Sequence, residues 1–370
     1  MLNFPPHSEL KRYDWGANLV ASTATTPPPA SSSGKSSVLP PVVMSAALGY
    51  SLKHFQNFID SLREHYSGDV WLLISEDAGT SVGDGGSKKE TEDNEDEVSE
   101  GSLIRSYLQE QNVHYLTSHW GKQDDAVNNG EVWEQINRGR FKFFSAVCDP
   151  AYYSLCLTTD FRDSIFQSNP FANIHRLLLP PPKEEDKDPP KGILHVFEHN
   201  KIMSPWHYGR MKHKKCNLYD IYGKKILEPH NIINGGSIIG SPYAYERIYK
   251  FMAYIWRGCN DQVILNLLVR SKILSEPRAA RLKGIPSFKK FDRNSTAVYG
   301  YGDGIQTEVH PIDVQIHKQG YGPMNVLGHG GKIVRHGKNG KFLNRNCIVS
   351  PVVHQYDLVT CPSIKNMPIH

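Results

Sequence analysis

Two apolar runs on either side of an amphipathic segment constrain the fold of this chain most. Val42 to Ala47 and Asp69 to Ile74 have the length of buried strands, and Leu52 to Tyr66 between them carries apolar residues at helical spacing. A strand, a helix and a second strand within about thirty residues form the βαβ unit of a parallel sheet, whose crossover is right-handed. Because parallel strands end at one edge of a sheet, we expect ligand-binding loops to follow these strands.

The alternation of short apolar runs and amphipathic segments continues along the chain and predicts the α/β class. We expect a single Rossmann-like, mostly parallel sheet flanked by helices, and a mixed one because the C-terminal half is less regular. Further strands are predicted over 113–116, 153–157, 192–197 and 232–240, and further helices over 103–111, 131–147, 243–254 and 261–270.

Composition predicts one folded domain over 41–360, flanked and interrupted by segments too polar to fold alone. These are a flexible Ser-, Thr- and Pro-rich leader over 1–40, an acidic disordered insertion over 76–102, a Pro-rich charged loop over 180–191 and a tail over 361–370. The insertion holds ten acidic residues from Glu76 to Glu100 against Lys88 and Lys89, whereas the whole chain has a formal net charge of +4. The rest of the chain is therefore basic.

A basic body attracts anions such as nucleic acid, lipid headgroups or the diphosphate of a nucleotide. The basic residues form short clusters over 210–215 and 332–345, with no recognition-helix or zinc-finger pattern nearby, so no nucleic-acid partner is expected. The six cysteines show no CxxC spacing, which argues against a zinc site or a dense disulfide framework. No run reaches the roughly 18 to 20 apolar residues of a membrane span, so none is expected in this chain.

Two carboxylates follow directly after a predicted buried strand. Residues 155–171 have the sequence LCLTTDFRDSIFQSNPF, which contains Asp160 and Asp163. The sheet holds such carboxylates rigidly, and Mg²⁺ or Mn²⁺ prefers oxygen ligands in this position. Arg162 lies between them and either pairs with Asp163 or binds a phosphate. The alternative is that Asp160 caps a turn or helix and Asp163 balances Arg162.

A second candidate site comprises a glycine pair and the start of a later helix. Residues 233–241 have the sequence INGGSIIGS, in which Gly235 and Gly236 allow the backbone to approach a ligand closely; an ordinary tight turn explains them equally well. In CNDQVILNLLV, Asn260 is a suitable helix cap and Asp261 is favoured in the first turn. Capping does not explain Gln262.

Four segments in this order resemble one group of enzymes. TTDFRDSIFQSNPF resembles the metal-binding segment of GT-A glycosyltransferases that combine TD-x-RD with an FQ-x-x-PF tail, and INGGSIIGS resembles their sugar- or acceptor-contacting segment. The DQ-x-x-x-N pattern is similar to that of retaining enzymes of the galactosyltransferase and glycogenin type, and VVHQYD resembles the group's ending. The chain departs from most GT-A enzymes, which carry D-x-D, and has Leu358 where an Arg often follows Asp357.

The resemblance implies a GT-A fold and metal-dependent transfer of a sugar from a UDP- or GDP-sugar donor to a hydroxyl acceptor on a glycan or glycoprotein, with retention of anomeric configuration. It implies that Asp160, Asp163 and His354 hold Mn²⁺ or Mg²⁺, although a lone histidine is more often a structural residue. It also implies that Asp261 positions the sugar, that Gln262 flanks the anomeric carbon, and that sugar or acceptor contacts come from Asn234, Gly235 and Gly236.

Three further residues are weaker candidates. Tyr50, after the first strand, would stack on the nucleotide base, and Arg140 would contact phosphate or ribose. Glu198, at another strand end, would face the acceptor. Core packing explains the first two equally well, and a solvated turn explains Glu198 equally well.

Two other functions are compatible with such a sheet. A sugar-nucleotide nucleotidyltransferase would carry a Gly-rich, Lys-Arg signature after the first strand, which SAALGYSLKHF lacks. A non-catalytic nucleotide-sugar-binding module would not need the metal and sugar residues that this chain keeps. The compartment stays open: we expect the Golgi lumen if an N-terminal anchor is missing from this sequence, and the cytoplasm otherwise.

Overall fold

The computed structural model describes residues 19–21, 39–75, 99–118, 140–172, 174, 192–202, 226–227, 230–250, 261–275, 311–319, 323–326, 335–336, 341–343 and 349–354. Most of the predicted leader and acidic insertion, and all of the predicted loop over 180–191 and tail over 361–370, lie outside these residues. Where the insertion was expected to continue to 102, helix α3 begins at Glu100 with Ser99 as its N-cap. None of the described helices has the length and apolar content needed to cross a membrane.

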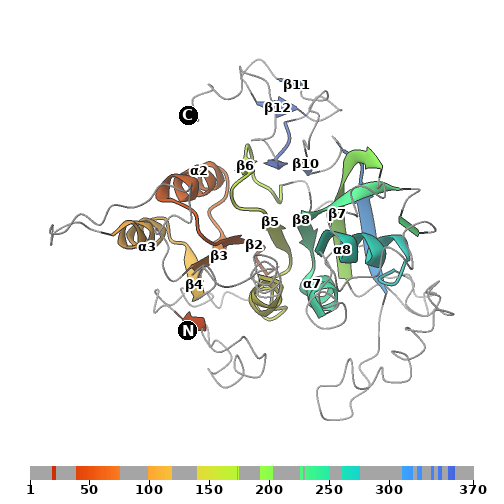
Figure 1. The fold of residues 1–370 in the computed structure, drawn as a ribbon, viewed down its shortest axis with the longest axis horizontal. Helices are drawn as coiled ribbons and strands as arrows, with labels where there is room; N and C mark the ends of the chain where they lie inside the picture. Colours follow the sequence, from red (N-terminus) through yellow and green to blue (C-terminus); the bar gives the residue numbers. More distant parts are fainter. Residues whose placement is uncertain are drawn as a thin grey trace, which may run out of the picture.

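The centre of the fold is an eight-stranded mixed sheet with the order β1-β4-β3-β2-β5-β8-β7-β9 (Figure 1). Strands β2 to β5 pair in parallel, as do β7 and β9, while β8 is antiparallel to both β5 and β7. This confirms the predicted α/β class with a mostly parallel mixed sheet. The strands are β1 (Leu19–Ala21), β2 (Val42–Ala47), β3 (Asp69–Ser75), β4 (His114–Ser118), β5 (Cys156–Thr159), β7 (Gly192–Ile202), β8 (Asn231–Gly240) and β9 (Ile312–His317).

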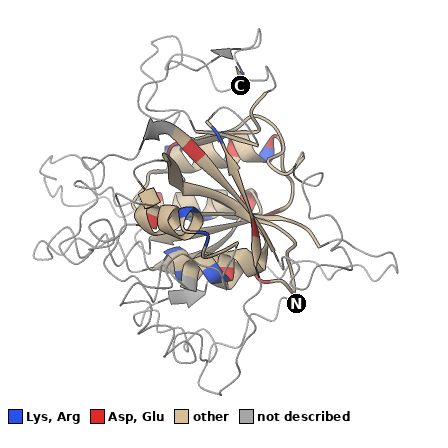
Figure 2. Ribbon diagram, turned by 90° about the vertical axis from the view of Figure 1, so that its right-hand side faces the viewer, with Lys and Arg blue, Asp and Glu red and all other residues tan. Residues whose placement is uncertain are grey.

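Helices cover both faces of this sheet, which explains why its strands are nearly continuous apolar runs. Val43 and Leu72 belong to the core on the face covered by α2 (Leu52–Arg63) and α3 (Glu100–Glu110). Met44 and Leu73 belong to the opposite core, with helical residues 140–147, α7 (Pro242–Lys250) and α8 (Asp261–Arg270). The strands of the main sheet are almost entirely tan in Figure 2, because few of their residues are charged.

A small sheet brings a C-terminal segment against the end of β5. Its order is β10-β13-β6, formed by Met324–Val326, Val352–His354 and Ser164–Phe166. β13 is antiparallel to β6 and places His354 opposite Ser164. A further pair joins β11 (Arg335–His336) to β12 (Phe342–Leu343).

Gln167, from the FQ tail of the acidic segment, fastens this C-terminal part. Its Nε2 donates to the carbonyl oxygens of Phe342 at 3.1 Å and Ser350 at 2.9 Å, and its Oε1 accepts from the Phe342 N–H at 2.7 Å. The side chain is buried, so these hydrogen bonds are shielded from water. Gln167 thus joins the segment that follows Asp160 and Asp163 to the C-terminal part of the chain.

Two details lie beyond the sequence-based expectations. Leu19–Ala21, inside the predicted leader, forms edge strand β1 antiparallel to β4. A disulfide joins Cys148, just after helical residues 140–147, to Cys156 at the start of β5. The other four cysteines lie outside the described residues, so the expectation of no dense disulfide framework stays a prediction.

A histidine pair joins β7 to edge strand β9, with His195 buried and His317 half-buried, and we expect it to make stability depend on pH. Nδ1 of His195 in β7 lies 2.9 Å from Nε2 of His317 in β9, and the two rings stack. Burial, and then the nearby His317, lowers the pKa of His195 from its usual 6.5 to about 4. The folded protein therefore keeps His195 neutral over a pH range in which the unfolded chain binds a proton there.

We expect the free energy of unfolding to fall by about 3 kcal/mol as the pH falls from about 6.5 to about 4. Over this range His195 gains a proton in the unfolded chain but not in the folded protein. Urea unfolding at pH 7 and near pH 4 would measure this loss in the wild type and in His195→Leu. The wild type should lose more stability than the variant on acidification. Equal losses would show that His195 does not titrate as described.

Candidate active site

Three side chains that are distant in sequence meet at the carboxyl edge of the parallel strands. Asp160 directly follows β5, Asp163 directly precedes β6, and His354 ends β13. One ligand atom from each lies within 4.8 Å of the others. Nε2 of His354 is 3.5 Å from Asp160 Oδ2 and 3.6 Å from Asp163 Oδ1. The structure therefore brings together the three residues predicted to bind a metal.

The cluster is buried at its base and open on one side. The side chain of His354 is 0% exposed, that of Asp163 13% and that of Asp160 40%. Nε2 of His354 makes no hydrogen bond with any residue that the structure describes, although it is buried. Such a nitrogen is costly to bury without a partner. Two carboxylates and one imidazole nitrogen in this arrangement fit Mn²⁺, and also Mg²⁺ with additional water ligands.

Gly236 in β8 lies directly against this cluster. A Cβ atom at this position would lie 2.0 Å from Asp160 Oδ2 and 2.8 Å from His354 Cε1. Asn234 Oδ1 accepts the Gly236 N–H at 2.7 Å, and Asn234 Nδ2 lies 3.0 Å from His199 Nε2. The lack of a side chain at Gly236 therefore lets the β8 backbone lie close to the Asp160 carboxylate, and Asn234 holds that backbone in place. The proposed sugar contact of Asn234 stays a prediction.

Arg140 connects the candidate metal cluster to the candidate sugar-binding residue. Its Nη1 lies 3.4 Å from Asp160 Oδ1, and its Nη2 forms an ion pair with Asp261 Oδ2. Burial alone would lower the pKa of Arg140, but Asp261 and Asp160 raise it above its usual value, so the guanidinium stays charged. Arg140 thus fixes two carboxylates from different elements relative to each other. Its contact with phosphate or ribose stays a prediction.

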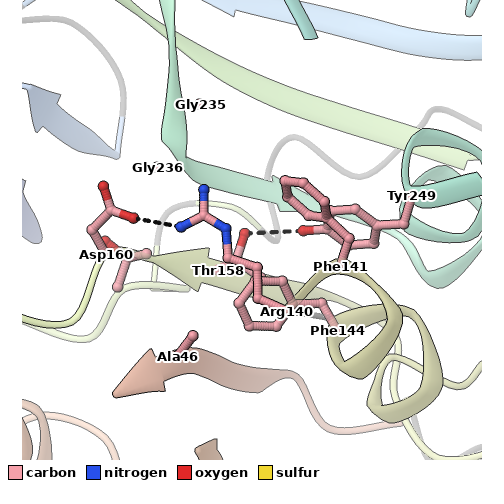
Figure 3. A pocket seen from close by; sticks show the side chains of 10 residues that line it. Ala46, Arg140, Phe141, Phe144, Thr158, Asp160, Gly235, Gly236 and Tyr249 are labelled. Carbon is pink, nitrogen blue, oxygen red and sulfur yellow. Dashed lines mark hydrogen bonds and ion pairs between the residues drawn. The ribbon is translucent and has the colours of Figure 1, made fainter. Parts of the chain in front are cut away.

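A small pocket lies beside Arg140 and under the glycine pair (Figure 3). The Arg140 side chain extends past the rings of Phe141 and Phe144 toward Asp160, with Gly236 nearby on β8. The pocket therefore joins an aromatic wall to the charged cluster. Its lining consists of Ala46, Arg140, Phe141, Phe144, Thr158, Thr159, Asp160, Gly235, Gly236 and Tyr249.

The start of α8 is clamped to β8. Asn266 Oδ1 accepts the Ile233 N–H at 2.8 Å, and its Nδ2 donates to the Ile233 carbonyl oxygen at 2.8 Å. Gly235 makes the approach possible, because a Cβ there would lie 3.0 Å from the Cα of Gln262. Asp261 is buried and accepts the Gln262 N–H at 2.8 Å. Asn260, the predicted cap, lies outside the described residues.

Tyr50 and Arg162 lie at the rim of the cluster. The ring of Tyr50 stacks on Phe161, with ring centroids 5.6 Å apart, and is partly buried. Burial raises the pKa of Tyr50, while the charge of Arg162 opposes this shift. Arg162 is exposed. The predicted roles of Tyr50 on a base and Arg162 on a phosphate stay predictions.

Glu198 is not a solvated turn residue. It lies inside β7, and its Oε1 accepts from Arg270 Nη2 at 2.5 Å in an ion pair whose side chains are each 9% exposed. Its Oε2 accepts from Asn231 Nδ2 at 3.3 Å. Glu198 therefore connects the end of α8 to the β7 and β8 pair. No sequence pattern indicates this ion pair, because Arg270 lies 72 positions from Glu198.

No protein-family model matches this chain, and neither does any curated protein sequence. Among solved structures it is similar to the WbbM bifunctional glycosyltransferase in its apo form, with 9% identity and a TM-score of 0.33 over 64% of this chain and 39% of that one. It is also similar to glucosyl-3-phosphoglycerate synthase from Mycobacterium tuberculosis in complex with Mn²⁺, UDP and phosphoglyceric acid, with 13% identity and a TM-score of 0.30 over 76% of this chain and 69% of that one. A third, described as a mycobacterial protein, has 15% identity and a TM-score of 0.27 over 63% of this chain and 74% of that one. At these low values, the case for a function depends on the geometry of the site.

Proposed function

We propose that this protein is a metal-dependent glycosyltransferase of the GT-A type that moves a sugar from a UDP- or GDP-sugar to a hydroxyl group of a glycan or glycoprotein. The observation that carries the proposal is the convergence of Asp160, Asp163 and His354 beside the pair formed by Arg140 and Asp261. One group of ligands suits a cation and the other suits sugar hydroxyls, and both lie at the edge of the sheet where α/β proteins bind nucleotides.

Asp160, Asp163 and His354 would hold Mn²⁺ or Mg²⁺, which neutralises phosphate oxygens and so stabilises a nucleoside diphosphate leaving group. Arg162, exposed at the rim, would supply a further positive charge to the phosphates. Tyr50 would stack on the base, because its ring lies next to the same cluster on an aromatic support. These roles account for the donor's nucleotide half.

The sugar half would lie against α8 and β8. Asp261 would accept hydrogen bonds from sugar hydroxyls, with its ion pair to Arg140 holding the carboxylate in place. Gln262 would flank the anomeric carbon, and Asn234, Gly235 and Gly236 would border the sugar, because Gly235 lies against Gln262 and Gly236 against Asp160. Each role is part of the proposal.

Retention of anomeric configuration is compatible with the contacts that the carboxylates of this site make. Among the residues that the structure describes, the carboxylates of this site are committed to the metal cluster or to Arg140, which disfavours a covalent glycosyl intermediate. Attack on the same face as the departing diphosphate is then the simplest path. The anomeric configuration of a fresh product, measured by ¹H NMR, tests it, and an inverted linkage would contradict it.

The disulfide supports a luminal site of action. Disulfides persist in oxidising compartments and are rare in the cytosol. The Cys148 and Cys156 bond is buried between helical residues 140–147 and β5, on both of which pocket residues lie. We therefore favour the Golgi lumen over the cytoplasm.

Incubation with a panel of UDP- and GDP-sugars tests the proposed activity. We expect Mn²⁺-dependent release of nucleoside diphosphate from one donor, because slow hydrolysis accompanies donor binding when water replaces the acceptor. Chelation with EDTA should remove the activity and added Mn²⁺ should restore it. Failure of every donor to be bound or cleaved with Mn²⁺ present would contradict the proposal.

A further inference from the structure

Four buried side chains connect the main sheet to the small sheet directly behind the metal cluster. Ser237 lies opposite Thr159 in β8 and β5, and His354 lies opposite Ser164 in β13 and β6. The hydroxyl of Ser237 contacts Nδ1 of His354 and lies 3.1 Å from Thr159 Oγ1, which is 2.6 Å from Ser164 Oγ. All four residues are buried, so water cannot replace these partners.

The two nitrogens of His354 face different surroundings. Nδ1 faces Ser237, whereas Nε2 faces the carboxylates of Asp160 and Asp163. A neutral imidazole carries its proton on one nitrogen and a lone pair on the other. Nε2 can bind a cation only when the proton is on Nδ1, and the Ser237 oxygen is placed to accept that proton's hydrogen bond.

The direction of the remaining hydrogen bonds follows from this choice. With its oxygen accepting from His354, the Ser237 hydroxyl is free to donate to Thr159 Oγ1, and Thr159 can then donate to Ser164 Oγ. Each contact thus has one donor. The strand registers fix the positions of all four residues, so the imidazole is held at both its backbone and its ring.

We propose that Ser237 is a positioning residue that keeps His354 in the Nδ1–H tautomer and aims its Nε2 at Asp160 and Asp163. The inference rests on the proposed metal-dependent function. Partners that orient a ligating histidine in this way change metal affinity about tenfold to a hundredfold when removed. If Ser237 merely linked the two sheets, its replacement would change stability and leave metal affinity unchanged.

Titration with Mn²⁺, followed by electron paramagnetic resonance of the free ion, tests the assignment. We expect the Kd of Ser237→Ala to rise about tenfold to a hundredfold. Ser271→Ala is the matched control, because Ser271 is equally buried and its hydroxyl donates to the Leu267 carbonyl oxygen at 2.6 Å, in the turn that follows α8; its Kd should equal that of the wild type. An unchanged Kd in Ser237→Ala would overturn the role of Ser237 and leave the proposed function standing. A wild type without Mn²⁺ affinity would overturn both.

A second measurement does not depend on whether Ser237→Ala folds. In the Mg²⁺-loaded protein with ¹⁵N-labelled histidine, we expect a slowly exchanging Nδ1 proton on His354, identified by its loss in His354→Gln. Slow exchange follows from a hydrogen bond to a buried oxygen. A proton found on Nε2, or rapid exchange at Nδ1, would overturn the inference even if Ser237→Ala failed to fold.

Discussion

Asp163→Ala should lower the proposed Mn²⁺-dependent turnover by about a thousandfold or more and leave the melting temperature nearly unchanged. Loss of one ligand from a three-residue cation site removes charge stabilisation of about 4 kcal/mol or more, and each 1.36 kcal/mol is about a tenfold change in rate. Stability changes little because Asp163 lies close to another carboxylate, Asp160, so its removal relieves like-charge repulsion in the metal-free protein. Donor cleavage and thermal unfolding measure the two effects.

Two further variants separate the role of charge from that of shape. Asp163→Asn keeps the size of the side chain and should lose nearly as much activity as Asp163→Ala. Asp313→Ala, on β9 at the far edge of the sheet, removes a carboxylate away from the cluster and should keep full turnover. A large drop in melting temperature for Asp163→Ala, with residual activity, would favour a structural role for this carboxylate.

Gly236→Ala should weaken Mn²⁺ binding about a hundredfold or more. The added methyl group would lie 2.0 Å from Asp160 Oδ2, so the carboxylate must move away from His354. The side chain of Asp160 is 40% exposed and can turn toward solvent, so we expect loss of the metal site rather than loss of the fold. Calorimetric titration with Mn²⁺ measures the affinity. The expected change of about a hundredfold or more corresponds to the loss of one ligand.

Gly240→Ala is the control for backbone effects on the same strand. Its Cβ would lie 3.1 Å from the Ile193 carbonyl oxygen, away from the cluster, and should cost some stability without changing Mn²⁺ affinity. If Gly236→Ala bound Mn²⁺ as tightly as the wild type, the close approach of β8 to Asp160 would have no part in forming the site.

The local parts of the fold could be predicted from the sequence because short-range patterns define them. The predicted strand over Val42 to Ala47 matches β2, and the predicted helix from Asp261 to Arg270 matches α8. The carboxylates after β5 were likewise visible as an apolar run leading into an acidic motif. In each case a short apolar run or its polar boundary can be recognised in the sequence without the structure.

Long-range pairings could not be predicted, because no local period encodes them. The three-residue strands β6, β10 and β13 are too short to show alternation, yet they bring His354 to Asp163. The ion pair of Arg140 with Asp261 spans 121 positions. Resemblance to a family suggested His354, but gave no sign of the hydroxyl of Ser237 behind it. The anchoring role of Gln167 was likewise not predicted, because the FQ tail entered only as part of the resemblance.

Diffraction at the manganese edge from crystals grown with Mn²⁺ and UDP tests the central claim most directly. We expect one anomalous peak whose distances to carboxylate oxygens of Asp160 and Asp163 and to Nε2 of His354 are about 2.0–2.6 Å, with the diphosphate on its open side. Manganese bound elsewhere, or a nucleotide bound with these three side chains away from any ion, would contradict the account.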